Sequence, residues 1–112
     1  MTVRAFRRWQ VSWSIKIKDH ITDKWFGNVR DISLGGMGMI SKFPLQPKTI
    51  HTLKIDLSEE DTTFDELTLE AKIIWCKEQG KDMYRAGMLF KDRDDMDKEK
   101  IQEIIDKYGF PA

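Results

Sequence analysis

Apolar and polar residues alternate with a period of two along several stretches of this chain, and this pattern constrains the fold more than any other feature. A segment with such alternation is a β-strand that buries one face and leaves the other in water. The longest stretch covers residues 67–75, where Ile74 is the one exception to the alternation. Shorter stretches predict strands at residues 11–17, 53–57 and 84–90, and two more are predicted on either side of a glycine cluster, at residues 25–32 and 37–41.

These six strands are expected to pair antiparallel and to close into a small barrel. The last two form a hairpin through a turn at residues 79–82. Large side chains that fit the core or the rim of the barrel are Trp25, Phe26, Trp75 and Phe90, with Met37, Met39, Met83 and Met88 filling gaps in the core.

Only the end of the chain changes period. Its apolar residues Ile101, Ile104, Ile105 and Tyr108 have the spacing of a helix with one buried stripe. Asp94 or Asp95 can cap the start of this helix, and Gly109 and Pro111 stand where a helix stops. We therefore expect an all-β fold with a terminal helix: a six-stranded antiparallel β-barrel plus a C-terminal α-helix at residues 94–108.

Composition narrows the class of protein. A chain of 112 residues, 40% of them hydrophobic, builds one core, so residues 1–112 are expected to form a single domain. Nineteen basic residues balance nineteen acidic ones, which argues against a general binder of DNA or RNA. The absence of a signal-like or membrane-length apolar run predicts a cytoplasmic protein without membrane insertion.

Residues suited to catalysis or metal binding are few. His20 and His51 are isolated from other ligands and are expected at the surface. Cys76 is the only cysteine, has no evident histidine partner, and fits a packing or surface position. We therefore expect neither an enzyme nor a cofactor.

Two short patterns carry the functional signal: Arg4-x-x-x-Arg8, and Asp31-x-Ser33-x-x-Gly36. An arginine presents a planar fork of donors that pairs with a phosphate or with the O6 and N7 edge of guanine. A carboxylate accepts hydrogen bonds from N1 and N2 of guanine, and a serine hydroxyl can donate to a phosphate oxygen. Together the two patterns predict a receptor for an anion that carries guanine.

Neighbouring residues extend both patterns. Gly35 and Gly36 either allow positive φ or let the backbone approach a ligand closely. Arg7 either adds a phosphate contact or faces solvent. Residues 1–10 precede the first strand and are rich in arginine, so we expect this segment to be mobile without ligand and ordered with it.

The two patterns, in this order, resemble those of the PilZ domain family, bacterial receptor modules for cyclic di-GMP. The family has an arginine pair before the first barrel strand and a [D/N]-x-S-x-x-G pattern after the second, and 22 residues separate Arg8 from Asp31 here. The pair Ile74-Trp75, residues 84–90 and the closing helix also resemble the family pattern. The resemblance covers nearly the whole chain.

The resemblance implies a role for each motif residue: Arg4 and Arg8 bind guanine and phosphate, Asp31 binds the guanine edge, Ser33 binds phosphate, and Gly36 shapes the turn. It also implies that residues 1–10 clasp the ligand, often an intercalated dimer, over a barrel at residues 11–91. A protein partner, for example in motility or biofilm regulation, would read the changed surface. Family members often have a proline two residues after the second arginine; this chain lacks it, and packing of Trp9 is expected to compensate.

Two other functions stay open. A degenerate PilZ module would bind a protein partner and no nucleotide, but such modules lack the arginines that this chain has. A barrel with exposed aromatic residues could bind single-stranded nucleic acid, but the zero net charge argues against that function.

Overall fold

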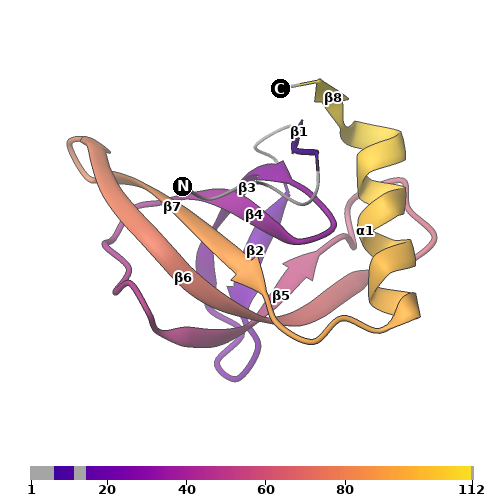
Figure 1. Ribbon diagram of the computed structural model, residues 1–112, viewed down its shortest axis with the longest axis horizontal. Helices are drawn as coiled ribbons and strands as arrows, with labels where there is room; N and C mark the ends of the chain where they lie inside the picture. The colour runs from indigo at the N-terminus through magenta and orange to yellow at the C-terminus, as the bar shows by residue number, and fades with distance from the viewer. Residues whose placement is uncertain (1–6, 12–14, 112) are drawn as a thin grey trace.

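The computed structural model describes residues 7–11 and 15–111. Within them, eight strands and one helix follow one another along the chain (Figure 1). The elements are β1 (Trp9–Gln10), β2 (Lys16–Asp19), β3 (Trp25–Ile32), β4 (Gly36–Ser41), β5 (Ile50–Asp56), β6 (Glu66–Gly80), β7 (Met83–Phe90), α1 (Asp95–Tyr108) and β8 (Phe110–Pro111).

Six of these strands form a closed ring. Neighbours in the ring follow the order β2, β5, β6, β7, β4 and β3, and β3 pairs with β2 to close it. Every pairing is antiparallel. The predicted six-stranded antiparallel barrel with a C-terminal helix is confirmed. The strands β1 and β8 lie outside the ring, since β1 pairs with β3 and β8 pairs with β1, and neither short strand was predicted.

Apolar side chains fill the ring, as the alternation predicted. Met37, Met39 and Met88 are buried in this core. Met83 is not: it lies at the start of β7 and is 39% exposed, so its assignment to the core was wrong. The reason is its place beside the hairpin turn, beyond the point where other strands cover the inner face of β6 and β7.

The strand boundaries differ from the predicted ones at two places. The predicted strand at residues 11–17 includes residues 12–14, which lie outside the described residues, and β2 starts only at Lys16. The predicted turn at residues 79–82 is shorter, because β6 continues to Gly80 and only Lys81 and Asp82 connect it to β7. Asp82 has a φ of 56°, a left-handed conformation that aspartate tolerates better than most residues.

A β-bulge interrupts the longest strand. Ile73 is opposite Met88 on β7, whereas Trp75 is opposite Gly87, so Ile74 is an extra residue in β6. Ile73 is buried, while Ile74 and Trp75 are both exposed, by 44% and 42%. The alternation predicted Trp75 on the same inner face as Ile73, and that orientation was wrong because the bulge turns the strand over.

The helix α1 packs against the barrel on one side (Figure 1), with Ile101, Ile104 and Ile105 buried. Asp94 is its N-cap: the carboxylate of Asp94 accepts from the backbone N–H of Asp97, and the carboxylate of Asp97 accepts from the backbone N–H of Asp94. This reciprocal capping fixes the helix start at one of the two aspartates that the sequence indicated.

Candidate ligand-binding site

A row of four residues crosses the outer face of the barrel. Asp31 on β3 is opposite Gly38 on β4, Gly38 is opposite Gly87 on β7, and Gly87 is opposite Trp75 on β6. With neighbouring strands about 4.8 Å apart, the row is about 14 Å long. The two central glycines leave a low floor, bounded by a carboxylate at one end and by an indole at the other. We call this row the glycine floor.

Both glycines are needed because the end residues lean over them. A Cβ added to Gly38 would lie 2.6 Å from Oδ2 of Asp31, and one added to Gly87 would lie 2.2 Å from Nε1 of Trp75. These separations are far below van der Waals contact. The carboxylate and the indole therefore occupy space that the missing Cβ atoms leave.

Asp31 is the electrostatic centre of the floor. Its carboxylate is buried and forms an ion pair with Nη1 of Arg8. It also contacts Nη1 of Arg30 at 3.3 Å and accepts from the backbone N–H of Gly38 at 3.1 Å. Two cations and one amide therefore contact a carboxylate that the fold has largely removed from water.

A second bulge places Arg30 beside Asp31. Val29 is opposite Met39 and Asp31 is opposite Gly38, so Arg30 is the extra residue in β3. Of the register irregularities in the sheet, the two at Arg30 and Ile74 lie at the ends of this row. Bulges re-aim side chains next to binding sites, and here they bring an arginine and a tryptophan onto the outer face.

Ser33 and the two glycines after it form a tight turn between β3 and β4. The Ser33 hydroxyl accepts from the backbone N–H groups of Gly35 and Gly36, at 3.2 Å each, and donates to the Gly36 carbonyl at 3.3 Å. The hydroxyl is buried and used within the turn. The local role of Ser33 is thus to shape the loop that joins the two strands carrying Asp31 and Gly38.

Glycine is required at position 36 because of a close backbone contact and not because of positive φ. No described glycine has positive φ. A Cβ on Gly36 would lie 2.2 Å from the carbonyl oxygen of Met88, so only glycine lets β4 approach β7 at this point. Of the two explanations that the sequence left open, positive φ does not apply to Gly36, and approach to a ligand stays a prediction, because the close approach seen here is to a neighbouring strand.

The arginine segment enters the site through Arg8. Arg8 is half-buried against Asp31, and the next residues, Trp9 and Gln10, pair with Ile32 and Asp31 on β3. Arg7 is exposed, and its guanidinium lies 4.4 Å from the centre of the Trp9 ring. Trp9 packs on the core, as expected if its packing compensates for the missing proline. Arg4 lies outside the described residues.

The structure therefore brings together Arg8, Asp31 and the turn of Ser33, Gly35 and Gly36, and it adds residues that motif reasoning missed: Arg30, Gly38, Gly87 and Trp75. The sequence contained one signal for them, the break in alternation at Ile74. Chemically, the floor offers cationic donors, a carboxylate acceptor and an indole that can stack on a base.

Other candidate residues show no site chemistry. His20 is exposed, as expected; His51 is half-buried, with its ring centre 5.2 Å from that of Phe26. Sγ of Cys76 accepts from the backbone N–H of Leu45 at 3.3 Å. In residues 7–11 and 15–111, no three histidine, cysteine or acidic side chains gather as a metal site, and no helix there is long and apolar enough to cross a membrane.

A small antiparallel barrel with a C-terminal helix and an arginine-carboxylate pair on its outer face defines a class of compact ligand-binding domains. The PilZ domain model matches residues 2–107. The chain therefore belongs to the PilZ domain family. No curated protein sequence matches it.

Solved structures agree with this assignment. The fold is similar to the PilZ domain of YcgR from Escherichia coli, solved with c-di-GMP, at 17% identity and a TM-score of 0.73, over 96% of this chain and 92% of that one. It is also similar to the K. pneumonia MrkH–c-di-GMP complex, at 19% identity and a TM-score of 0.70, over 94% of this chain and 52% of that one. A third match is the Bacillus subtilis inhibitor of motility MotI/DgrA, at 17% identity and a TM-score of 0.67, over 96% and 52%. This chain thus spans about half the length of MrkH and MotI, and at these identities the likeness shows the fold.

Proposed function

We propose that this protein is a receptor for cyclic di-GMP and not an enzyme. The observation that carries the proposal is the meeting of Arg8 and Asp31, which lie far apart in the sequence, at the end of a glycine floor closed by Trp75. Membership of the PilZ family and the c-di-GMP complexes of YcgR and MrkH support the same ligand. The proposed binding residues are Arg4, Arg8, Asp31, Ser33 and Gly36, with Arg7 and Gly35 as additional candidates.

The contacts of Asp31 suggest how ligand binding changes the protein. Oδ1 accepts from Arg8 and from the Gly38 amide, and Oδ2 contacts Arg30. A carboxylate offers about four acceptor positions and three donors already contact this one, so a guanine edge that takes two positions displaces at least one of these donors. Arg8 is the partner on the segment before the barrel. We infer that Arg8 exchanges Asp31 for the ligand, and that the segment at residues 1–10 then clasps it.

The same geometry supports separate roles for Ser33 and Trp75. The Ser33 hydroxyl reaches a phosphate only by giving up its bond to the Gly36 carbonyl, so any phosphate contact competes with the turn. Trp75 is exposed at the far end of the floor, where its indole can stack on a guanine. The site thus separates guanine recognition at Asp31 from stacking at Trp75.

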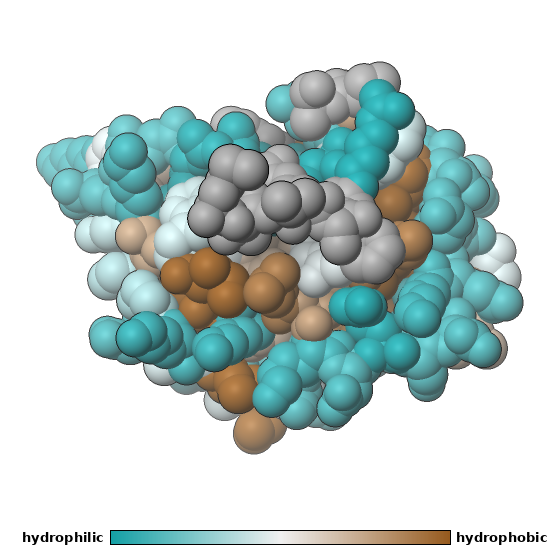
Figure 2. Space-filling view, viewed as in Figure 1, coloured by the Kyte–Doolittle hydropathy of each residue, from teal (hydrophilic) through white to brown (hydrophobic). Residues whose placement is uncertain are grey.

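The output of the receptor is proposed to be a protein contact. Figure 2 shows hydrophobic residues gathered on a face otherwise rich in hydrophilic ones, and the exposed apolar residues of β6 and β7 are Ile74, Trp75, Met83 and Leu89. Ile74 is the bulge residue and Trp75 is the end of the glycine floor, so bound ligand would alter the surroundings of both. We infer a cytoplasmic role in which a partner, for example in motility or biofilm regulation, reads this change.

Calorimetric titration with cyclic di-GMP tests the function. The wild-type protein is expected to bind, and Arg8→Ala and Asp31→Ala are each expected to weaken binding about 100-fold, because the first removes a proposed cationic contact to the ligand and the second removes the proposed acceptor for the guanine edge. Lys98→Ala, on the exposed side of α1, is the control and should bind as the wild type does.

Two other outcomes would contradict the proposed function. A folded wild-type protein that gives no heat with cyclic di-GMP would refute receptor function and leave a protein-binding module. Binding of oligonucleotides with indifference to cyclic di-GMP would instead indicate the nucleic-acid function.

A further inference from the structure

Arg85 is a half-buried cation on the outer face of β7. Side chains along a strand point alternately to its two faces. Ala86 and Met88 belong to the core, so Arg85 and Gly87 lie on the outer face. The Nε atom of Arg85 is buried and donates to no acceptor among the described residues. A buried donor without an acceptor loses its bond to water and gains nothing in exchange.

Among the described residues, no aspartate or glutamate forms an ion pair with Arg85. Every aspartate and glutamate of the sequence belongs to the described residues, because residues 1–6, 12–14 and 112 include none. Within 4.0 Å, the ion pairs of these carboxylates are with Arg8, Lys18, Arg30 and Lys54. Arg85 forms none. An anion bound at the glycine floor would supply the counter-charge that these carboxylates do not.

The position of Arg85 indicates which molecule supplies it. Arg85 is two residues before Gly87, about 7 Å along the strand, so its side chain is long enough to reach over the glycine floor. Its cross-strand neighbours are Lys77 on β6 and Ile40 on β4. Lys77 is exposed and has the same sign of charge. Arg85 and Lys77 thus form a cationic edge along one side of the floor, while Arg8 and Arg30 lie at its Asp31 end.

We propose that Arg85 binds a phosphate of the ligand that occupies the glycine floor. This inference rests on the proposed function. A cyclic dinucleotide carries two phosphates between two guanosines, so a ligand with one guanine at Asp31 extends a phosphate and a second base toward Gly87 and Trp75. A guanidinium whose Nε–H is unused donates to such a phosphate through two parallel bonds. The site then has cations on two sides and is selective for a ligand with phosphate between its bases.

Titration of two Arg85 variants with cyclic di-GMP tests the proposal. Arg85→Gln is expected to weaken binding about tenfold, since it removes a charge-assisted hydrogen bond. Arg85→Lys is expected to bind more tightly than Arg85→Gln and more weakly than the wild type, because a lysine keeps the positive charge but cannot form the two parallel bonds. Lys98→Gln is the matched control for loss of a charge far from the floor. Thermal unfolding of each variant is measured first, to compare only folded proteins.

A measurement on the wild-type protein avoids dependence on any variant. The Nε–Hε resonance of Arg85, observed by ¹⁵N NMR, should shift when cyclic di-GMP is added. If the wild type binds but this resonance stays in place, or if Arg85→Gln binds equally well, the proposal is refuted and receptor function stands. If Arg85→Lys is as weak as Arg85→Gln, the phosphate contact is refuted. A wild type that does not bind refutes the proposed function itself.

Discussion

At the scale of single residues, glycine decides where this barrel can present a site. Gly36 faces the backbone of β7, where a Cβ would meet the Met88 carbonyl oxygen at 2.2 Å. Gly87 faces a side chain, where a Cβ would meet Nε1 of Trp75, also at 2.2 Å. The two separations are equal, but the atoms differ in freedom to move, since a ladder of backbone hydrogen bonds holds the carbonyl and Trp75 is partly in solvent.

This difference predicts that two alanine substitutions destabilise the protein to different extents. Gly36→Ala should lower the free energy of unfolding by about 2 kcal/mol or more, because β4 and β7 must separate locally. Gly87→Ala should cost less than about 1 kcal/mol but swing the Trp75 indole out, which weakens ligand binding. Urea unfolding measures the first effect, and the Nε1–H resonance of Trp75 reports the second. Equal destabilisation by both substitutions would contradict this view of the floor.

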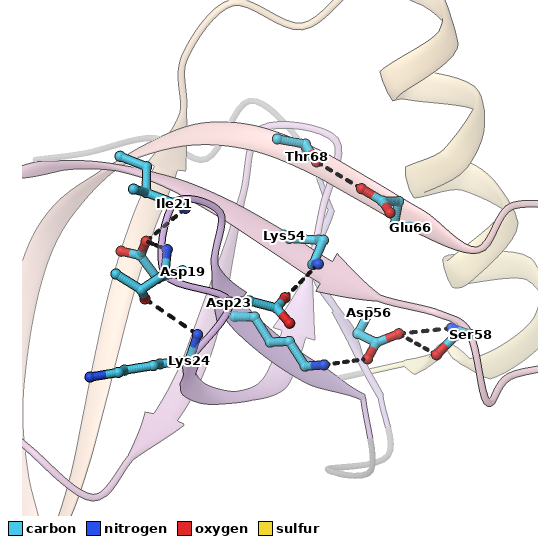
Figure 3. A network of polar contacts seen from close by, with 11 residues as sticks. Asp19, Ile21, Asp23, Lys24, Lys54, Asp56, Ser58, Glu66 and Thr68 are labelled. Carbon is cyan, nitrogen blue, oxygen red and sulfur yellow. Dashed lines mark hydrogen bonds and ion pairs between the residues drawn. The ribbon is translucent and has the colours of Figure 1, made fainter.

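At the scale of elements, polar contacts at the end of β2 and β5 tie the hairpins together (Figure 3). Nζ of Lys18 lies 3.2 Å from Oδ2 of Asp56, and Asp56 accepts from both the backbone N–H and the hydroxyl of Ser58, at 2.9 and 2.6 Å. Lys54 pairs with Asp23 at 2.6 Å across the same region. Hydrogen bonds from Ser58 and the charge of Lys18 lower the pKa of Asp56 to about 2.

The lowered pKa of Asp56 predicts a pH dependence of stability. An aspartate of the unfolded chain titrates near 3.8, so above that pH the folded state has the full benefit of the ionised carboxylate, and the benefit is lost as the pH falls toward 2. The free energy of unfolding should therefore rise more steeply between pH 2 and pH 4 in the wild type than in Asp56→Asn. Ser58→Ala, which removes the largest cause of the lowered pKa, should give an intermediate slope. If denaturant titrations show that the free energy of unfolding rises equally with pH in all three proteins, the lowered pKa of Asp56 is disproved.

At the scale of the whole molecule, the two ends of the described chain meet beside the site. Gln10 pairs with Asp31 on one side and with Phe110 on the other, so β8 and β3 enclose β1 (Figure 1). Gly109, the C-cap of α1, is packed so closely that its Cβ would lie 3.2 Å from that of Trp9. The helix and the residues after Arg8 are thus one structural unit.

Removal of β8 should loosen that unit without opening the barrel. Deletion of residues 110–112 takes away one of the two strands that pair with β1, so the amides of Trp9 and Gln10 should exchange with deuterium about tenfold faster. Amides of β3 to β7 serve as the internal control and should keep their rates. Unchanged exchange at Trp9 and Gln10 would show that β3 alone holds β1.

Local patterns in the sequence were sufficient for much of this architecture. Alternation predicted the barrel strands because a strand with one buried face has a period of two whatever its partner is. The helix start followed from aspartates whose capping bonds reach only three residues along the chain. The residues Arg8, Asp31, Ser33 and Gly36 were identifiable because their types and spacing form a pattern that resembles a known family.

Other features depend on contacts between distant segments, and only the tertiary structure decided them. The bulges at Arg30 and Ile74 arise where two strands of unequal residue count must pair, so neither strand alone reveals which residue is extra, or that Trp75 faces outward. The short strands β1 and β8 exist because β3 offers an edge. The sequence by itself determined which residue types are available for the proposed binding of a guanine-bearing anion; strand register determined that Asp31, two glycines and Trp75 lie in one row, because register is a property of pairs of strands.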